Sequence, residues 1–348
     1  MAVSHTPGEC RDSQPGRGLL HSYVVVLSMF LLLILVSSIS AAGQTCLTAD
    51  DMDEPVRTAI ANTASRYFSM AAHGDTAGLR QSAIATLASD FGGIERAVQD
   101  NQSIFSGAQP TSRPPFLLEA EGTAPLPRAE FLCGVFGPKG QTTHSAVFVI
   151  PNLAPGHYAI VIFDVAAGSG PRTLSLVLQQ EGSEWRLGGF YIKASQLAGH
   201  DGSWFAERAA QFKAKGEMHN AWFYYLEARE LSVPVPFMNT LATDQLYDQM
   251  QDLKPADLPP GELTAGGKAF RPTAIFPSVV GSDFDLEVKY PSADISNTQQ
   301  TFRDNMAVIK ALVARYPEFR DGFAGVIARA VAPSGNDYGS LLAMKDIK

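Results

Sequence analysis

The cysteines offer the first chemistry that the sequence constrains. There are three, Cys10, Cys46 and Cys133, and Cys10 would leave with an N-terminal export segment. Two cysteines that remain in an oxidising compartment most simply form a disulfide, with two separate buried thiols as the alternative. Neither has a histidine or another cysteine at ligand spacing, which argues against a zinc site. We therefore predict a disulfide between Cys46 and Cys133 and no metal.

Carboxylates are numerous but follow no catalytic motif. Asp164 lies at the end of a strongly apolar predicted strand at 157–165 and is the first candidate for an acid–base group. An aspartate in such a position more often ends the strand and caps a turn. Glu119 and Glu121 lie on another predicted strand, without a partner that the sequence identifies.

Histidines and serines show no catalytic spacing either. His144 and His157 flank one pair of predicted strands and could approach each other, although a surface or turn position is commoner for each. The sequence has no His-x-His pair, no His-Glu-x-x-His helix and no Gly-x-Ser-x-Gly elbow. The compact Gly-Ser-Gly at 168–170 is typical of a turn. No nucleophile with a base and no metal-ligand cluster is therefore predicted.

The segment 261–268 superficially resembles a phosphate-binding loop. That motif needs a glycine five residues before its Gly-Lys pair and a hydroxyl residue after the pair. This chain has Glu262 and Ala269 at those positions. We expect no nucleotide and no other cofactor.

A helical pattern at 203–231 carries many aromatic residues. Gly216 divides it into two predicted helices, and Ala221 and Ala228 stand where two helices would cross closely. This spacing resembles a tetratricopeptide-type helical hairpin, with Arg208 where that family usually has leucine. Only one unit is visible, and arrays need about three, so the hairpin should dock on its neighbours. Its aromatic side chains could line a ligand site but are more often core: Trp204, Phe205, Phe212, Trp222, Tyr224 and Tyr225.

The N-terminus has the pattern of an export signal. Residues 23–36 are apolar and uncharged, two arginines precede them, and four acidic residues follow at 50–54. Basic residues stay on the cytoplasmic side, which places the rest of the chain outside. The run is shorter than the roughly 20 residues of a membrane span, and cleavage after Ala42 fits the small residues there. We predict a cleaved signal peptide, with an uncleaved anchor as the alternative; the residues before Cys46 fit lipidation poorly.

Bulk composition sets wide limits. The chain has 348 residues, of which 45% are hydrophobic and 18% charged, which is typical of a globular protein of two or three domains. Its 27 basic and 35 acidic residues give a net charge of -8. Nucleic acid is not an expected partner, since phosphate binding needs a clustered basic surface.

The elements that must position these residues change character along the chain. Helical periodicity comes first, at 53–72, 76–88 and 93–99. Six strands separated by glycine and proline turns follow, at 117–122, 130–136, 145–150, 157–165, 173–180 and 185–193. Consecutive apolar residues in 157–165 predict a central strand that is covered on both faces. Helices followed by an antiparallel sheet predict an α+β domain over 47–196, with the helices on one face.

The order of these elements resembles the cone-shaped fold of the nuclear transport factor 2-like superfamily, in which a curved sheet wraps a long helix. The likeness lies in topology and in the final predicted hairpin at 174–193. Such a cone can house an acid–base carboxylate in its mouth, which directs attention to Asp164. The mature chain is also similar to a family of exported bacterial proteins of unknown function, a resemblance that implies export and no activity.

The C-terminal part predicts a small β-α-β unit. A helix at 239–253 and a proline-rich linker at 255–261 come before it. Strands are expected near 269–276, 284–290, 323–331 and 338–344, with a helix at 298–315. On that helix one face should carry Phe302, Met306, Ile309, Leu312 and Val313.

The sequence therefore predicts an α+β protein. Its parts are a signal peptide or anchor at 1–42, a mixed domain at 47–196, a helical hairpin region at 200–254, and a small α+β domain at 262–348. The leading function is that of a periplasmic or secreted, non-catalytic envelope protein that binds a protein or cell-wall partner. The alternatives are an extracytoplasmic small-molecule binder and an enzyme whose carboxylate-only site leaves no motif. A deep apolar hollow with polar groups would favour the small-molecule binder, and an exposed apolar patch the partner.

Overall fold

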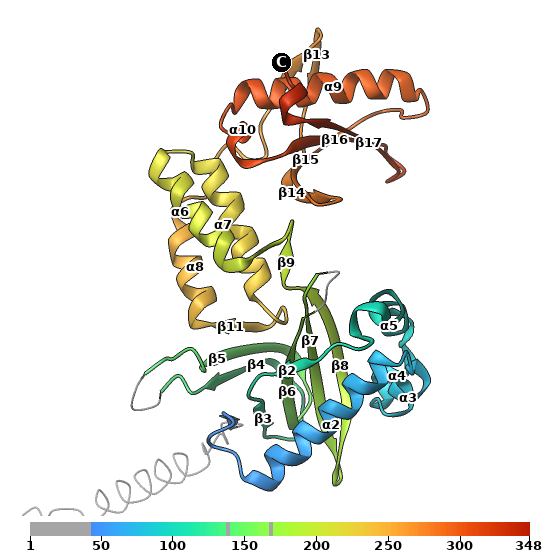
Figure 1. Ribbon diagram of the computed structural model, residues 1–348, viewed down its shortest axis with the longest axis vertical. Coiled ribbons are helices and arrows are strands. Elements are labelled where there is room, and N and C mark those ends of the chain that lie inside the picture. Colours follow the sequence, from blue (N-terminus) through green and yellow to red (C-terminus); the bar gives the residue numbers. More distant parts are fainter. Residues whose placement is uncertain (1–42, 137–139, 167–169) are drawn as a thin grey trace, which may run out of the picture. The chain divides into compact units, whose positions relative to one another are not determined.

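The computed structural model describes residues 43–136, 140–166 and 170–348, and Gln44 to Lys348 form one compact unit. Helices and mainly antiparallel sheets make up an α+β fold, as the sequence predicts (Figure 1). The predicted export segment lies outside the described residues, as do parts of two predicted turns. Within the described ranges, no helix combines the length and the apolar character that crossing a membrane requires.

Helices come first along the described chain: α2 (Glu54–Ala72), α3 (Thr76–Gln81), α4 (Ala85–Ser89) and α5 (Gly92–Phe105). The buried face of α2 consists of Ile60, Ala64, Tyr67, Phe68 and Ala71. The single helix predicted at 76–88 is divided into α3 and α4. The reason is that Ala83 and Ile84 leave the helix to pair with Leu187 of a strand, and the Ile84 N–H donates to the Leu187 carbonyl at 2.9 Å.

Six strands form the first sheet: β1 (Gln44–Leu47), β2 (Pro110–Ser112), β3 (Phe116–Ala120), β6 (Gly156–Val165), β7 (Arg172–Glu181) and β8 (Glu184–Ala194). Their order is β1-β3-β6-β7-β8, with β2 also pairing with β6. Alternate residues of β6 belong to two cores. Those on the side of the helices are Ala159, Val161, Phe163 and Val165. Those on the other side are Tyr158, Ile160 and Ile162. The prediction of a central strand covered on both faces is confirmed.

A second sheet covers the face of the first sheet that is opposite the helices. It consists of β4 (Leu126–Cys133), β5 (Ala146–Leu153) and β11 (Met238–Thr240). The sequence predicts β4 and β5 as strands of a single sheet, but they form a layer of their own. β11 lies where a helix is predicted to begin, and its strand geometry comes from pairing with β5, with Met238 opposite Phe148.

The predicted helical hairpin is confirmed. A short strand pair, β9 (Gln196–Leu197) and β10 (His200–Asp201), leads into α6 (Gly202–Lys215), and α7 (Met218–Ser232) and α8 (Leu241–Gln251) follow. Gly216 ends α6 with a φ of +82°, the left-handed conformation that glycine adopts without a Cβ penalty. Asp201 caps α6 by accepting a hydrogen bond from the Trp204 N–H.

The C-terminal unit is a four-stranded sheet with a covering helix. Its elements are β12 (Leu263–Ala265), β13 (Lys268–Phe270), β14 (Ala274–Val280), β15 (Asp283–Pro291), α9 (Thr298–Arg315), α10 (Phe319–Gly322), β16 (Gly325–Val331), β17 (Asp337–Ala343) and a final 3₁₀ turn (Met344–Asp346). β12 and β13 pair only with each other, and the main sheet has the order β14-β15-β16-β17. β15 and β16 run parallel on either side of α9 in the sequence, so the predicted β-α-β unit is confirmed.

The predicted buried face of α9 is confirmed at Ile309, Leu312 and Val313, with Met306 packed against the core, and is wrong at Phe302. Phe302 is 48% exposed, whereas Thr301 and Asn305 are buried. The cause is a buried polar network: the Tyr290 hydroxyl donates to Asn305 Oδ1 at 2.6 Å, and Asn305 Nδ2 donates to Ser340 Oγ at 2.9 Å. Apolar periodicity alone does not reveal such a network, because its members count as polar in the pattern.

The hairpin and the C-terminal sheet share one hydrophobic core. The Phe284 ring of β15 lies 5.0 Å from the Phe205 ring of α6 and 5.1 Å from the Tyr224 ring of α7. The predicted linker at 255–261 thus connects elements that contribute to the same core. The division into domains at that point stays a prediction.

Candidate functional site

A hollow of about 620 Å³ lies between the two sheets, beside the core that they share. Chain segments at 48–50 after β1, 113–116 before and at the start of β3, and 143–145 before β5 converge on it. Met238 and Thr240 of β11 complete the wall. The apolar part of the lining consists of Ala49, Pro114, Pro115, Phe116, Ile162 and Met238. The hollow is within the size range of small-molecule sites, about 300–1,000 Å³.

Several polar side chains of the lining already stabilise the fold. Ser145 Oγ donates to the Gly134 carbonyl at 2.7 Å. Thr48 Oγ1 donates to Asp51 Oδ2 at 2.6 Å. Thr240 caps the start of α8 with its hydroxyl oxygen. These three hydroxyl groups therefore have structural partners within the fold.

Other polar groups of the lining remain available to a ligand. Arg113 donates through Nε and Nη2 to the two carboxylate oxygens of Asp164, at 2.8 and 2.7 Å. This bidentate contact fixes the guanidinium plane and leaves Nη1 unused within the described part of the chain. The side chains of Asp50 and His144 likewise have no hydrogen-bond partner in the described ranges. A cation, an anion and an imidazole thus line one mostly apolar hollow.

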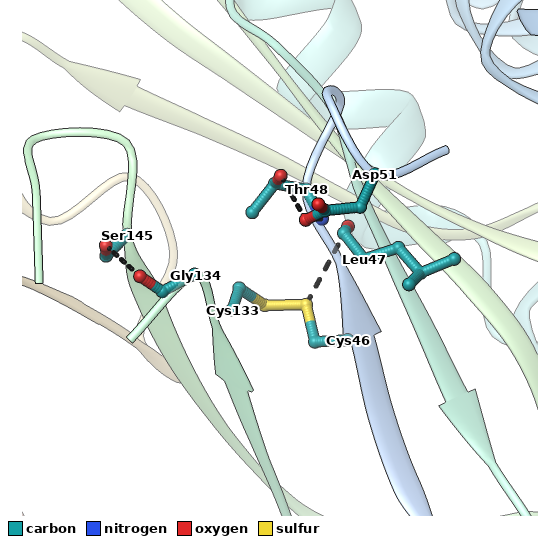
Figure 2. Close-up of a disulfide and its surroundings, with 7 residues drawn as sticks. All are labelled: Cys46, Leu47, Thr48, Asp51, Cys133, Gly134 and Ser145. Atoms are coloured by element: carbon teal, nitrogen blue, oxygen red, sulfur yellow. Dashed lines mark hydrogen bonds between the residues drawn. A yellow bond between two sulfur atoms is a disulfide. The ribbon is translucent and has the colours of Figure 1, made fainter. Parts of the chain in front are cut away.

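The predicted disulfide is present and lies close in sequence to a lining residue, Thr48. Cys46 in β1 and Cys133 at the end of β4 are bonded, with Cα atoms 5.0 Å apart. Figure 2 shows the bond between the segments that carry Thr48 and Gly134. These two residues are in close contact, since a Cβ on Gly134 would lie 3.1 Å from Thr48 Cγ2. The disulfide thus joins the first sheet to the second beside the hollow.

Asp164, the first candidate for acid–base chemistry, does not line the hollow. Its side chain is 46% exposed and holds Arg113, which does line it. Its role in the structure is therefore to position a guanidinium group. This agrees with the commoner, structural interpretation of an aspartate at a strand end.

The two candidate histidines are not brought together. His144 lines the hollow between the sheets, whereas His157 lines a separate one of about 330 Å³. There His157 Nδ1 is 3.0 Å from Gln180 Oε1, and its Nε2 is 3.9 Å from Glu119 Oε1. Glu121 is exposed beyond the end of β3. In the described part of the chain, no group of three or more histidine, cysteine or carboxylate side chains could hold a metal.

The aromatic residues of the hairpin are mainly core, as the sequence favours. Those that are buried are Phe205, Phe212, Tyr224 and Tyr225. Trp204 and Trp222 remain partly exposed. The glycine-rich segment at 261–268 is the β12–β13 hairpin.

Arg113 and the β11 residues of the hollow were missed by sequence reasoning. Arg113 stands before a Pro-Pro pair, a pattern that indicates only a loop, and its partner Asp164 lies 51 residues further along. Met238 reaches the hollow through a strand of three residues. Neither position carries a periodic signal, so their meeting depends on the tertiary fold.

Two polar clusters on α7 lie outside this site. His219 Nδ1 is 2.5 Å from Glu318 Oε1, and His219 Nε2 is 2.9 Å from Asp257 Oδ1. Each ring nitrogen of His219 thus has a carboxylate oxygen within hydrogen-bonding distance. The cluster therefore ties α7 to the start of α10 and to the chain that follows α8.

Glu227, further along α7, is a partly buried carboxylate. Burial raises the pKa of Glu227 to about 7; the Glu230 charge adds to this increase, and Lys193 opposes it. Lys193 Nζ pairs instead with Glu230 Oε1, at 2.6 Å. Among the described residues, Glu227 forms no ion pair of its own.

Comparisons with protein-family models, curated proteins and solved structures find no match for this chain. The resemblances to the tetratricopeptide hairpin, to the cone-shaped fold and to exported bacterial proteins therefore stay predictions. Function has to be argued from the hollows and their side chains.

Proposed function

We propose that the protein is exported and acts outside the cytoplasm by binding, without catalysis. Its ligand is an amphipathic small molecule that occupies the hollow between the two sheets. The observation that carries the proposal is the lining of that hollow, in which apolar side chains surround a few polar ones with unused hydrogen-bonding capacity. Such a lining buries a hydrocarbon part of a ligand and orients its polar part.

Arg113 is the residue that would orient the ligand. Because Asp164 holds it through two hydrogen bonds, the guanidinium group keeps its direction before a ligand arrives, which reduces the entropic cost of binding. Its remaining nitrogen can donate to an acidic or carbonyl oxygen. Asp50 and His144 can accept a hydrogen bond from the same polar part.

Export is supported by the charge asymmetry around residues 23–36 and by the disulfide. Disulfides persist in oxidising compartments and are rare in the cytosol. Binding is favoured over catalysis by the way the hydroxyl groups of the lining are used. Ser145 donates to a carbonyl and Thr48 to a carboxylate that caps its own turn, so each hydroxyl stabilises the wall.

A protein partner is the second function that we propose, in line with the expectation from sequence. It is favoured by a different feature, an aromatic hollow on the helical hairpin. That hollow and the one between the sheets have no lining residue in common. The two functions can therefore be tested separately.

The test of the small-molecule site uses a dye, 1-anilinonaphthalene-8-sulfonate, which combines apolar rings with one acidic group. We expect the oxidised mature protein to bind one dye molecule per chain at saturation. Thr143→Trp should fill the mouth of the hollow and weaken dye binding about tenfold or more, and Arg113→Gln should weaken it about threefold to tenfold. Ser103→Trp, an exposed position on α5 away from the hollow, is the matched control and should bind as the parent does.

Equal dye binding by Thr143→Trp and the parent would refute the site. A complementary measurement is native mass spectrometry of protein recovered from the compartment to which the cell exports it. We expect a bound small molecule on the parent and on Ser103→Trp, and none on Thr143→Trp. The same adduct on all three proteins would place the ligand elsewhere.

A further inference from the structure

The helical hairpin carries a hollow of about 310 Å³ where it meets the C-terminal sheet. Five indole, phenol or phenyl rings line it together with the His200 imidazole: Trp204, Phe205, Tyr224, Phe284 and Phe323. Four of these side chains are at most 8% exposed, whereas Trp204 is only partly buried. The indole ring is therefore the one that a ligand can reach most easily.

The rings fix one another in place. Trp204 packs edge to face on Phe205, with centroids 5.0 Å apart, and His200 stacks on the indole at 3.6 Å. The Tyr224 hydroxyl donates to the Gly322 carbonyl at 2.5 Å. With its hydroxyl engaged, Tyr224 contributes its ring to the hollow and no donor. The aromatic wall is thus rigid and rich in π electrons.

The charged part of the lining is acidic. Asp283 and Asp321 line the hollow and are exposed, and among the described residues no lysine or arginine lines it. Asp321 pairs with Lys215 at 3.5 Å, whereas Asp283 has no ion-pair or hydrogen-bond partner for its side chain in the described part of the chain. The negative charge of Asp283 also acts on Asp285, two residues along β15: burial raises the pKa of Asp285, and the Asp283 charge raises it further. Aromatic rings combined with carboxylates attract cations.

A second hollow, of about 290 Å³, is bordered by the same Trp204 and Tyr224 rings. Its charged lining residues, Glu207 and Arg208, have opposite signs, so it suits an uncharged polar group. The Arg208 guanidinium lies 4.5 Å from the centroid of the Phe212 ring, which shows that this region already accommodates a cation on an aromatic ring. Two hollows that share two rings suit neighbouring side chains of one extended segment, whereas a free amine would fill only one.

We propose that the hollow at Trp204 and Asp283 binds a lysine or arginine side chain of a protein partner that presents a basic segment. The cation lies against the indole ring and near the carboxylates of Asp283 and Asp321. A polar, uncharged side chain of the same segment occupies the neighbouring hollow.

The test uses the full mature chain labelled with 5-fluorotryptophan. The sequence has three tryptophans, so the protein gives three ¹⁹F signals, which Trp→Phe variants assign. The probe is the blocked peptide Gly-Lys-Gln-Gly, and the matched peptide carries norleucine in place of lysine. We expect the Trp204 signal to shift saturably with the lysine peptide and the Trp185 signal to stay in place. Raising the salt concentration should weaken binding, because the carboxylates are exposed.

Variants separate the acidic group from the rest of the surface. Asp283→Asn keeps the shape and should weaken the lysine peptide about threefold to tenfold. Asp100→Asn removes an exposed carboxylate of α5 and should leave binding unchanged. An unchanged Trp185 signal in Asp283→Asn verifies that the variant is folded.

Four results would overturn the proposal. One is a Trp204 signal that the lysine peptide does not move. The second is equal binding of the lysine and norleucine peptides, and the third is equal loss in the two asparagine variants. The fourth is binding of methylammonium as tight as that of the lysine peptide, which would make the site one for free amines. None of these results bears on dye binding between the sheets, so failure here leaves the proposed small-molecule site untouched.

Discussion

Changing Cys46 and Cys133 together to alanine should destabilise the protein while leaving its native fold intact. The two cysteines are separated by 87 residues, and the bond restricts that loop in the unfolded chain. In the chain-entropy model a loop of this length contributes about 4.6 kcal/mol to the free energy of unfolding at 25 °C. The double substitution avoids a lone reactive thiol, so the loss reports the cross-link itself.

The loss converts into a shift of the melting temperature. At about 2.1 cal/mol/K per residue, the roughly 305 residues from Gln44 to Lys348 have an unfolding entropy near 0.64 kcal/mol/K. The melting temperature should therefore fall by about 7 °C if these residues unfold together. If the first mixed domain unfolds on its own, the same loss gives about twice that shift, because half as many residues share it.

The assay is urea unfolding, followed by tryptophan fluorescence and by far-UV circular dichroism. The oxidised parent, the parent reduced with dithiothreitol and the double variant are compared. Reduced parent and variant should agree, and both should show a larger dependence on urea concentration, because an unlinked unfolded chain exposes more surface. Dye binding should also weaken in both, since the disulfide joins the two sheets two residues before Thr48, which lines the hollow. A loss below about 1 kcal/mol in both proteins would refute the argument from loop entropy.

Three further substitutions test the hairpin. Glu227→Gln should leave the free energy of unfolding unchanged near pH 4 and raise it at pH 8 by on the order of 2 kcal/mol. The reason is that the Glu227 pKa is about 7 in the folded protein, so ionisation of this side chain costs stability as the pH rises above about 4. A difference between variant and parent that does not depend on pH would contradict this. Gly216→Ala should lower the free energy of unfolding in urea by about 1 kcal/mol, because the φ angle of Gly216 is positive. Gly93→Ala, where an added Cβ meets open space, should lower it by nothing. Equal effects of the two substitutions would argue against the left-handed turn. His219→Gln should cost about 2 kcal/mol by calorimetry, because the hydrogen bonds of its ring to Glu318 and Asp257 are lost. His73→Gln at an exposed helix end should be near neutral, and the reverse order would disprove the cluster's role.

Long periodic segments could be predicted from sequence because each repeats one signal many times. The run 157–165 shows burial on both faces, and the helix at 298–315 has the predicted bounds. Gly216 also carries its own explanation, since a glycine between two helical patterns indicates a turn. The secondary structure predicted from sequence is wrong where a tertiary contact determines the conformation of a few residues. Ala83 leaves a helical pattern to pair with a strand, and the three residues of β11 become a strand because β5 lies beside them.

The site could be predicted less well than the fold, because its residues come from segments far apart in the sequence. Of the residues singled out from sequence, His144 lines the hollow, and Cys46 and Cys133 form the disulfide that joins the two sheets beside it. Asp164 is a candidate from sequence because it lies at a strand end. In the structure its role is to hold Arg113, a residue that no sequence pattern indicates. A side chain that acts by holding another one leaves no motif, since only the folded chain shows the pair.

β11 gives a physical reason to consider the two proposed functions in one protein. Met238 and Thr240 line the hollow between the sheets, and the same short strand connects α7 to α8 of the hairpin region. Thr240 in addition caps α8. A ligand that packs against β11 therefore contacts the segment through which the hairpin, with its aromatic hollow at Trp204, is attached to the first domain.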